Sequence, residues 1–162
     1  MEKRRIANRK VSPEEKMARE EERKERTEEV ENLLRTADRE NKAGRSGTAL
    51  SLCDRALRRG AGISQIGYRP QLCMASIWAS QEQWGPILKL FRRSKNPKPH
   101  WAGYARWQLQ GAHALRQVGD LTEAKRILLR IKKQPEVASE ALRALEKLEN
   151  TPKESHDGEK GP

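Results

Sequence analysis

Apolar residues recur along the chain at three- and four-residue spacing, over segments of about 12–18 residues. This period is typical of amphipathic helices, and no sustained alternation of apolar and polar residues suggests a strand. The helical segments are interrupted at Gly44, 60–62, Glu82, 96–99, 119–120 and Pro135. The pattern therefore predicts an all-α protein made of helices of similar length.

The central part of the chain repeats itself at intervals of 38 and 37 residues. The second helix of each copy can be aligned on an anchor residue, which is Ala49, Ile87 or Ala124. Five residues before each anchor is a turn position, occupied by Gly44, Glu82 and Gly119. Twelve and fifteen residues before it are alanine and leucine in all three copies: Ala37, Ala75, Ala112, Leu34, Leu72 and Leu109. This recurrence predicts stacked helical hairpins, which bury together the apolar faces that no single hairpin can bury.

These features resemble the tetratricopeptide repeat family, whose paired antiparallel helices stack into a solenoid. The resemblance covers roughly residues 29–135, and its most family-like part is 119–124, Gly-Asp-Leu-Thr-Glu-Ala. The period is longer than the 34 residues of that family. The middle copy also departs from its pattern, with Glu82 at the turn and Ile87 at the alanine position. The resemblance implies a fold that binds partners.

We predict a right-handed α-solenoid of about three helix-turn-helix repeats in residues 29–149, with a charged, partly helical or disordered arm at 1–28 and a disordered tail at 150–162. Ser12 and Pro13 are typical of a helix start within the arm. The last helix of the repeat region, 136–148, is amphipathic and is expected to cap the final repeat. Its predicted inward residues are Val137, Ala138, Ala141, Leu142, Leu145 and Leu148.

Positive charge is concentrated in the part of the chain that is predicted to fold. The chain has a formal net charge of +11, and residues 29–135 alone contain 20 Lys/Arg and 8 Asp/Glu. From residue 60 to 118, Glu82 is the only acidic residue. Six residues after each anchor is an arginine. These arginines and their basic neighbours predict a basic stripe on the outer faces of the second helices. The stripe consists of Arg55, Lys89, Arg93, Arg126, Arg130 and Lys133. Such a stripe favours an anionic partner, although arginine and lysine also occur on ordinary solvated helix faces.

The first helices of the repeats are expected to line an inner groove. The predicted partner-binding residues are Arg69, Leu72, Ser76, Arg106, Leu109, His113 and Arg116, with Leu34, Asp38, Lys42 and Ser80 as further candidates. A mixture of leucine and arginine suits a peptide with apolar and acidic residues. Some tetratricopeptide domains hold carboxylates with a Lys/Asn set in this groove, but leucine at 34, 72 and 109 departs from that set.

The sequence offers little material for catalysis. We find no catalytic constellation, no glycine-rich phosphate loop and no metal-ligand spacing, and we expect no enzyme activity, cofactor or metal site. Cys53 and Cys73 lie in apolar helical patterns and are predicted to be core residues without a disulfide. No segment is apolar enough to span a membrane, and we expect a cytoplasmic or nuclear location. Trp101 and Trp107, beside Arg106, could form an exposed stacking surface.

Three functions fit these observations. The first is a protein-interaction adaptor or scaffold that binds an acidic or amphipathic protein partner in the groove. The second is an RNA-associated or other nucleic-acid-associated protein that uses the basic stripe. The third is a structural subunit of a larger assembly. The sequence does not determine the oligomeric state.

Overall fold

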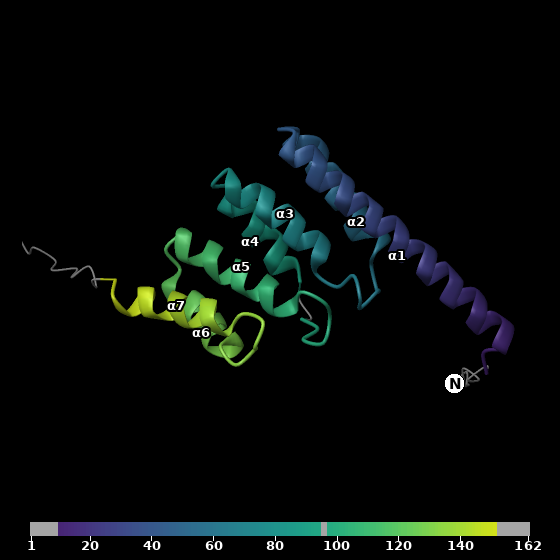
Figure 1. The fold of residues 1–162 in the computed structure, drawn as a ribbon. Coiled ribbons are helices and arrows are strands. Elements are labelled where there is room, and N and C mark those ends of the chain that lie inside the picture. The colour runs from purple at the N-terminus through teal and green to yellow at the C-terminus, as the bar shows by residue number, and fades with distance from the viewer. Residues whose placement is uncertain (1–9, 95–96, 152–162) are drawn as a thin grey trace, which may run out of the picture.

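The structure is a computed structural model that describes residues 10–94 and 97–151, and every regular element within these ranges is an α-helix. The helices are α1 (Pro13–Lys42), α2 (Ser46–Arg59), α3 (Arg69–Ser80), α4 (Trp84–Arg93), α5 (Tyr104–Gln117), α6 (Leu121–Ile131) and α7 (Ala138–Glu149) (Figure 1). The predicted all-α class is confirmed for the described part of the chain. The predictions for 1–9, at the start of the arm, and for 152–162, in the tail, fall outside the described residues.

The first helix begins at the cap that the sequence predicts. The Ser12 hydroxyl accepts a hydrogen bond from the Glu15 N–H at 3.1 Å, and Pro13 stands in the first turn, where its missing N–H costs nothing. The helix then runs without interruption across residue 28, the predicted end of the charged arm. Its first buried residue is Val30, and its N-terminal half extends beyond α2 (Figure 1).

Turns of the same geometry end α1, α3 and α5. The turn residues Gly44, Glu82 and Gly119 have φ values of 80°, 57° and 88°, in the left-handed region. The residue after each of them donates its N–H to a carbonyl five residues earlier, at 2.9 Å in each of the pairs Arg45–Glu40, Gln83–Trp78 and Asp120–Leu115. This is the Schellman ending of a helix, in which glycine is the usual residue at the left-handed position. Glu82 adopts it despite its side chain, and no other non-glycine residue in the described ranges has a positive φ.

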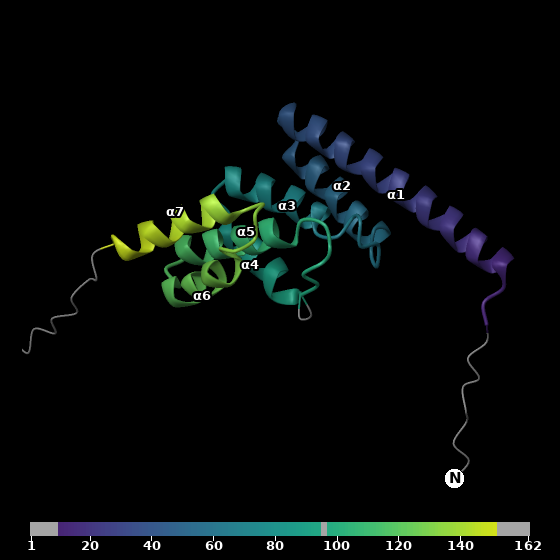
Figure 2. The same cartoon turned by 60° about the horizontal axis from the view of Figure 1, so that its bottom comes forward.

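The helices pack in the order of the chain. Each of α2, α4 and α6 lies against the odd-numbered helices on both sides, and α3 also contacts α1 and α5. Figure 2 shows the helices following one another from α1 to α7. The three anchors and the three alanines twelve residues before them are all buried, with exposed fractions of 0–1%: Ala49, Ile87, Ala124, Ala37, Ala75 and Ala112.

The loops that join successive hairpins also contact each other. The Tyr68 N–H donates to the Ala102 carbonyl at 2.8 Å, and the Ala102 N–H donates to the Ser64 carbonyl at 3.0 Å. Gly67 lies at this contact with a φ of 51°, and a Cβ atom there would be 2.3 Å from the Ala102 carbonyl oxygen. Only glycine fits, because both the backbone conformation and the available space exclude a side chain.

The last helix, α7, packs against α6 and buries Ala141 and Leu145. The prediction that Leu142 faces inward is wrong, because its side chain is 49% exposed. Leu142 follows Ala141 directly, and one residue is a rotation of about 100° around a helix. The buried stripe of α7 is therefore narrower than its apolar pattern suggested.

Cys53 of α2 and Cys73 of α3 are joined by a disulfide, so the prediction of unpaired cysteines is wrong. Cys53 is fully buried, as its apolar pattern indicated. Because α2 and α3 pack together, the two Cα atoms lie 6.4 Å apart, within the range that a disulfide spans. The sequence places each cysteine on an apolar face, but it does not show that these two faces meet.

Candidate functional site

The structure places the seven predicted groove residues on α3 and α5, and four of them line two separate pockets. The residues are Arg69, Leu72 and Ser76 on α3, and Arg106, Leu109, His113 and Arg116 on α5. Arg69 lines a pocket against α1, whereas Leu109, His113 and Arg116 line a pocket between α5 and α7. Leu72, Ser76 and Arg106 line neither pocket.

The α5–α7 pocket combines an apolar floor with cationic side chains. Its volume is about 350 Å³. The apolar lining is Leu109, Ala112, Leu128 and Ala144, and the other lining residues are Gln110, His113, Arg116, Glu140, Arg143 and Lys147. Arg143 and Lys147 are four residues apart and therefore share one face of α7. An apolar floor beside several cations suits a ligand with apolar and anionic groups.

The one carboxylate of this pocket is already paired. Arg106 Nη1 lies 3.1 Å from Glu140 Oε1, and its other terminal nitrogen donates to the Glu136 carbonyl at 3.3 Å. Within the described residues, Arg116, Arg143 and Lys147 form no ion pair. The pocket is therefore electropositive, and the nearest acid does not neutralise it.

His113 connects the pocket to α4. Its ring lies edge-on to the Trp84 ring of α4, with centroids 5.2 Å apart. Burial lowers the pKa of His113, and the neighbouring charges of Arg116 and Lys147 lower this pKa further. The imidazole is thus held in its neutral form at neutral pH.

The second pocket, between α1 and α3, is larger and has a mixed charge. Its volume is about 1040 Å³, and its lining is Glu31, Asn32, Leu34, Arg35, Thr36, Asp38, Arg39 and Arg69. Both of its acids are paired: Arg69 lies 3.3 Å from Glu31, and Asp38 lies 2.7 Å from Lys42. Three cations and two acids line this pocket, whereas three cations and one acid line the pocket beside α7, so the excess of positive charge is larger beside α7.

All six residues of the predicted basic stripe are exposed. They are Arg55 on α2, Lys89 and Arg93 on α4, Arg126 and Arg130 on α6, and Lys133 after α6. Acids accompany them more closely than the sequence suggested. Arg126 pairs with Glu123 at 2.5 Å, and Arg55 lines a hollow that also contains Glu25, Glu28 and Glu29 of α1.

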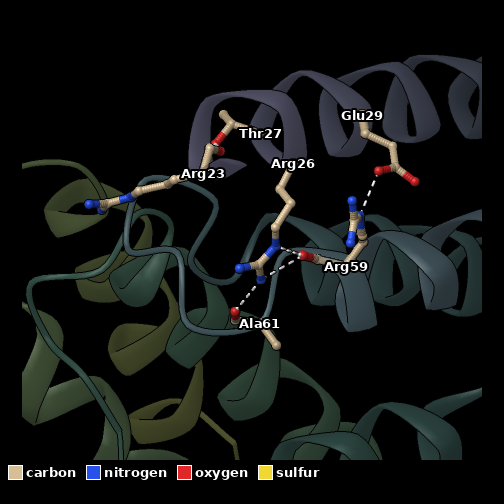
Figure 3. Close-up of polar contacts among 6 residues, drawn as sticks. All are labelled: Arg23, Arg26, Thr27, Glu29, Arg59 and Ala61. Carbon is tan, nitrogen blue, oxygen red and sulfur yellow. Dashed lines mark hydrogen bonds and ion pairs between the residues drawn. The ribbon is translucent and has the colours of Figure 1, made fainter. Parts of the chain in front are cut away.

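Sequence reasoning missed a contact that fixes α1 on α2. Arg26 donates hydrogen bonds to the carbonyls of Arg59, at 2.9 and 3.1 Å, and Ala61, at 2.8 Å (Figure 3). These carbonyls lie at the C-terminal end of α2, where backbone oxygens lack helical partners and the helix dipole favours a cation. Arg59 in turn pairs with Glu29 at 2.6 Å. The available signal was the spacing of Arg26, Glu29 and Val30, which places all three on one side of α1.

The proposed stacking surface of Trp101 and Trp107 is not formed. Trp107 is fully buried, and its ring lies 5.6 Å from the Phe91 ring. Trp101 is partly exposed, but one neighbour is the Tyr68 ring and the Lys98 ammonium lies 4.1 Å from its ring centre. The apolar spacing of α5 requires its inward face to include Trp107, so only one of the two rings reaches the surface.

Two further observations concern the described part of the chain. No group of three His, Cys, Asp or Glu side chains there is arranged to hold a metal ion. No helix there is long and apolar enough to cross a membrane. Comparison with known proteins found no matching family model, no similar curated protein and no similar solved structure.

Proposed function

We propose that this chain is a non-enzymatic adaptor that binds an acidic, amphipathic segment of a protein partner along the faces of α3, α5 and α7. The observation on which this rests is the α5–α7 pocket, where Leu109 and Ala144 lie beside Arg116, Arg143 and Lys147. Acidic side chains would meet the cations, and apolar side chains would cover the leucine.

The proposal includes a divergent tetratricopeptide-like solenoid of three hairpins and a cap. Three features support it: the recurring left-handed turns, the buried alanines at equivalent positions, and the contacts of α3 with both α1 and α5. In such a right-handed solenoid the odd-numbered helices line the inner face, and a bound segment would cross them one after another.

A pair of variants tests where the partner binds. The first is Leu72→Asp with Leu109→Asp, on the proposed inner face. The matched outer-face variant is Arg55→Gln with Arg130→Gln, which changes the net charge by the same amount. The probe is a short synthetic peptide of alternating leucine and glutamate, and binding is followed by fluorescence anisotropy. We expect the inner-face variant to lose binding and the outer-face variant to retain it.

Folding and charge must be controlled in this experiment. Circular dichroism shows whether each variant keeps its helix content, and Arg116→Gln replaces the leucine variant if that one unfolds. Loss of binding only in the outer-face variant would refute the adaptor proposal and favour the basic stripe. In that case mixed-sequence RNA should bind with a steep salt dependence, since counterions are released on phosphate binding.

A further inference from the structure

The positive charge that lines the α5–α7 pocket is greater than a single carboxylate would neutralise. Arg116 comes from α5, and Arg143 and Lys147 come from α7, so three permanent positive charges line one pocket. Glu140, the only acid among the lining residues, is paired with Arg106. His113 adds a further nitrogen donor or acceptor and lies within 3.5 Å of an Arg116 terminal nitrogen.

The size and lining of the pocket limit the kind of anionic ligand that it can hold. A volume of about 350 Å³ holds one or two side chains rather than a folded surface. Leu109, Leu128 and Ala144 give the pocket an apolar wall next to the cations. An anionic side chain with an apolar neighbour in sequence matches this combination.

We propose that the α5–α7 pocket binds a phosphorylated side chain of the protein partner, with an adjacent apolar residue against Leu109 and Ala144. A phosphoryl group has a charge of about −1.5 to −2 at neutral pH and three acceptor oxygens. Arg116 and Arg143 offer paired N–H donors that match phosphate oxygens, and Lys147 contributes a point charge. The inference rests on the proposed adaptor function and names the chemical group that its inner face selects.

The grouping of three cations in one small pocket favours a phosphorylated side chain over a nucleic acid as its ligand. A nucleic acid presents a row of phosphates and needs cations along an extended path. On the outer faces, Arg126 pairs with Glu123 and Arg58 pairs with Asp54, whereas Lys89, Arg93 and Arg130 form no ion pair within the described residues. Arg116, Arg143 and Lys147 instead line one pocket.

The test uses three degenerate peptide libraries that differ only in the fixed central residue, which is serine, glutamate or phosphoserine. Binding to the full chain is measured for the original sequence and for the double variant Arg143→Gln with Lys147→Gln. The matched control is Arg55→Gln with Arg130→Gln, which removes the same charge from the outer faces. We expect the phosphoserine library to bind about tenfold more tightly than the glutamate library, as one or two charge-assisted hydrogen bonds would give.

The expected result is that the pocket variant loses this preference and the control keeps it. Equal binding of all three libraries would overturn the phosphate inference but leave the adaptor function in place. Binding of none of them would overturn both. Equal loss in the two variants would overturn the inference by showing that overall charge, and not the pocket, attracts phosphate. Displacement of the phosphoserine library by mixed-sequence RNA would overturn it in favour of a nucleic acid.

Discussion

Arg106 of α5 forms an ion pair with Glu140 of α7, and this contact joins α5 to the last helix. The equivalent residue of the preceding repeat, Arg69, also stands eighteen residues before its anchor. Arg69 pairs in the opposite direction, with Glu31 of α1. Exposed pairs of this kind contribute only about 0–1 kcal/mol each. Their consequence is electrostatic: they neutralise Glu31 and Glu140 and leave the cations of the α5–α7 pocket free for a ligand.

Close packing at the buried alanines should make the fold sensitive to added volume. Ala75 of α3 has no exposed surface, so Ala75→Leu should lower the free energy of unfolding by about 1–3 kcal/mol through overpacking. The control is Ser76→Leu, at an exposed position of the same helix, which should change it by less than about 0.5 kcal/mol. Urea denaturation measures both. Similar values for the two variants would contradict the alignment of the repeats.

Arg26 should stabilise the fold although it belongs to the charged arm. Arg26→Ala removes its hydrogen bonds to the end of α2, at a cost of about 0.5–1.5 kcal/mol. Arg23 is the matched control, since it lies one turn earlier and its side chain points away from this contact (Figure 3). Thermal unfolding of both alanine variants should show a lower Tm for Arg26→Ala alone. An equal decrease would mean that α1 is held by general charge attraction.

The disulfide between Cys53 and Cys73 should stabilise the packing of α2 against α3. It closes a loop with a sequence separation of 20 residues, and reducing it should lower the free energy of unfolding by about 2–4 kcal/mol. Guanidinium denaturation with and without reductant measures the difference. The double variant Cys53→Ala with Cys73→Ala should not respond to reductant. Identical unfolding of the oxidised and reduced protein would show that the bond does not constrain the chain.

His113 should make stability depend on pH in the acidic range. The pKa of His113 is lowered in the folded chain from its ordinary value of 6.5, so the unfolded chain binds this proton first as the pH falls. The free energy of unfolding should therefore decrease below about pH 6.5 and level off once the folded imidazole is also protonated. His113→Gln should remove this part of the decrease. An unchanged pH profile in the variant would mean that the imidazole titrates as it does in an unfolded chain.

Periodicity in the sequence was sufficient to predict the helices and turns. Gly44, Glu82 and Gly119 share one turn geometry because the same helix ending recurs, and their spacing alone indicated this. The alignment even predicted a turn at Glu82, where glycine is absent. Local pattern suffices for such features, because a helix face and its ending depend on neighbouring residues.

The features that depend on contacts between distant residues could not be predicted in this way. Cys53 and Cys73 meet because α2 and α3 pack face to face, and no local pattern shows this. Arg143 and Lys147 lie outside the apolar face predicted for the last helix, yet they line the candidate pocket with His113 and Arg116. The sequence thus predicted the α5 half of the site and missed the α7 half.

NMR mapping tests most directly whether the inner face is the binding surface. The uniformly ¹⁵N-labelled chain is titrated with the peptide of alternating leucine and glutamate, and amide chemical shifts are followed. We predict the largest changes at Leu109, Arg116 and Lys147, with little change at Arg55, Arg93 and Arg130. Shifts confined to those three arginines, with the α5–α7 pocket unaffected, would contradict the proposed function.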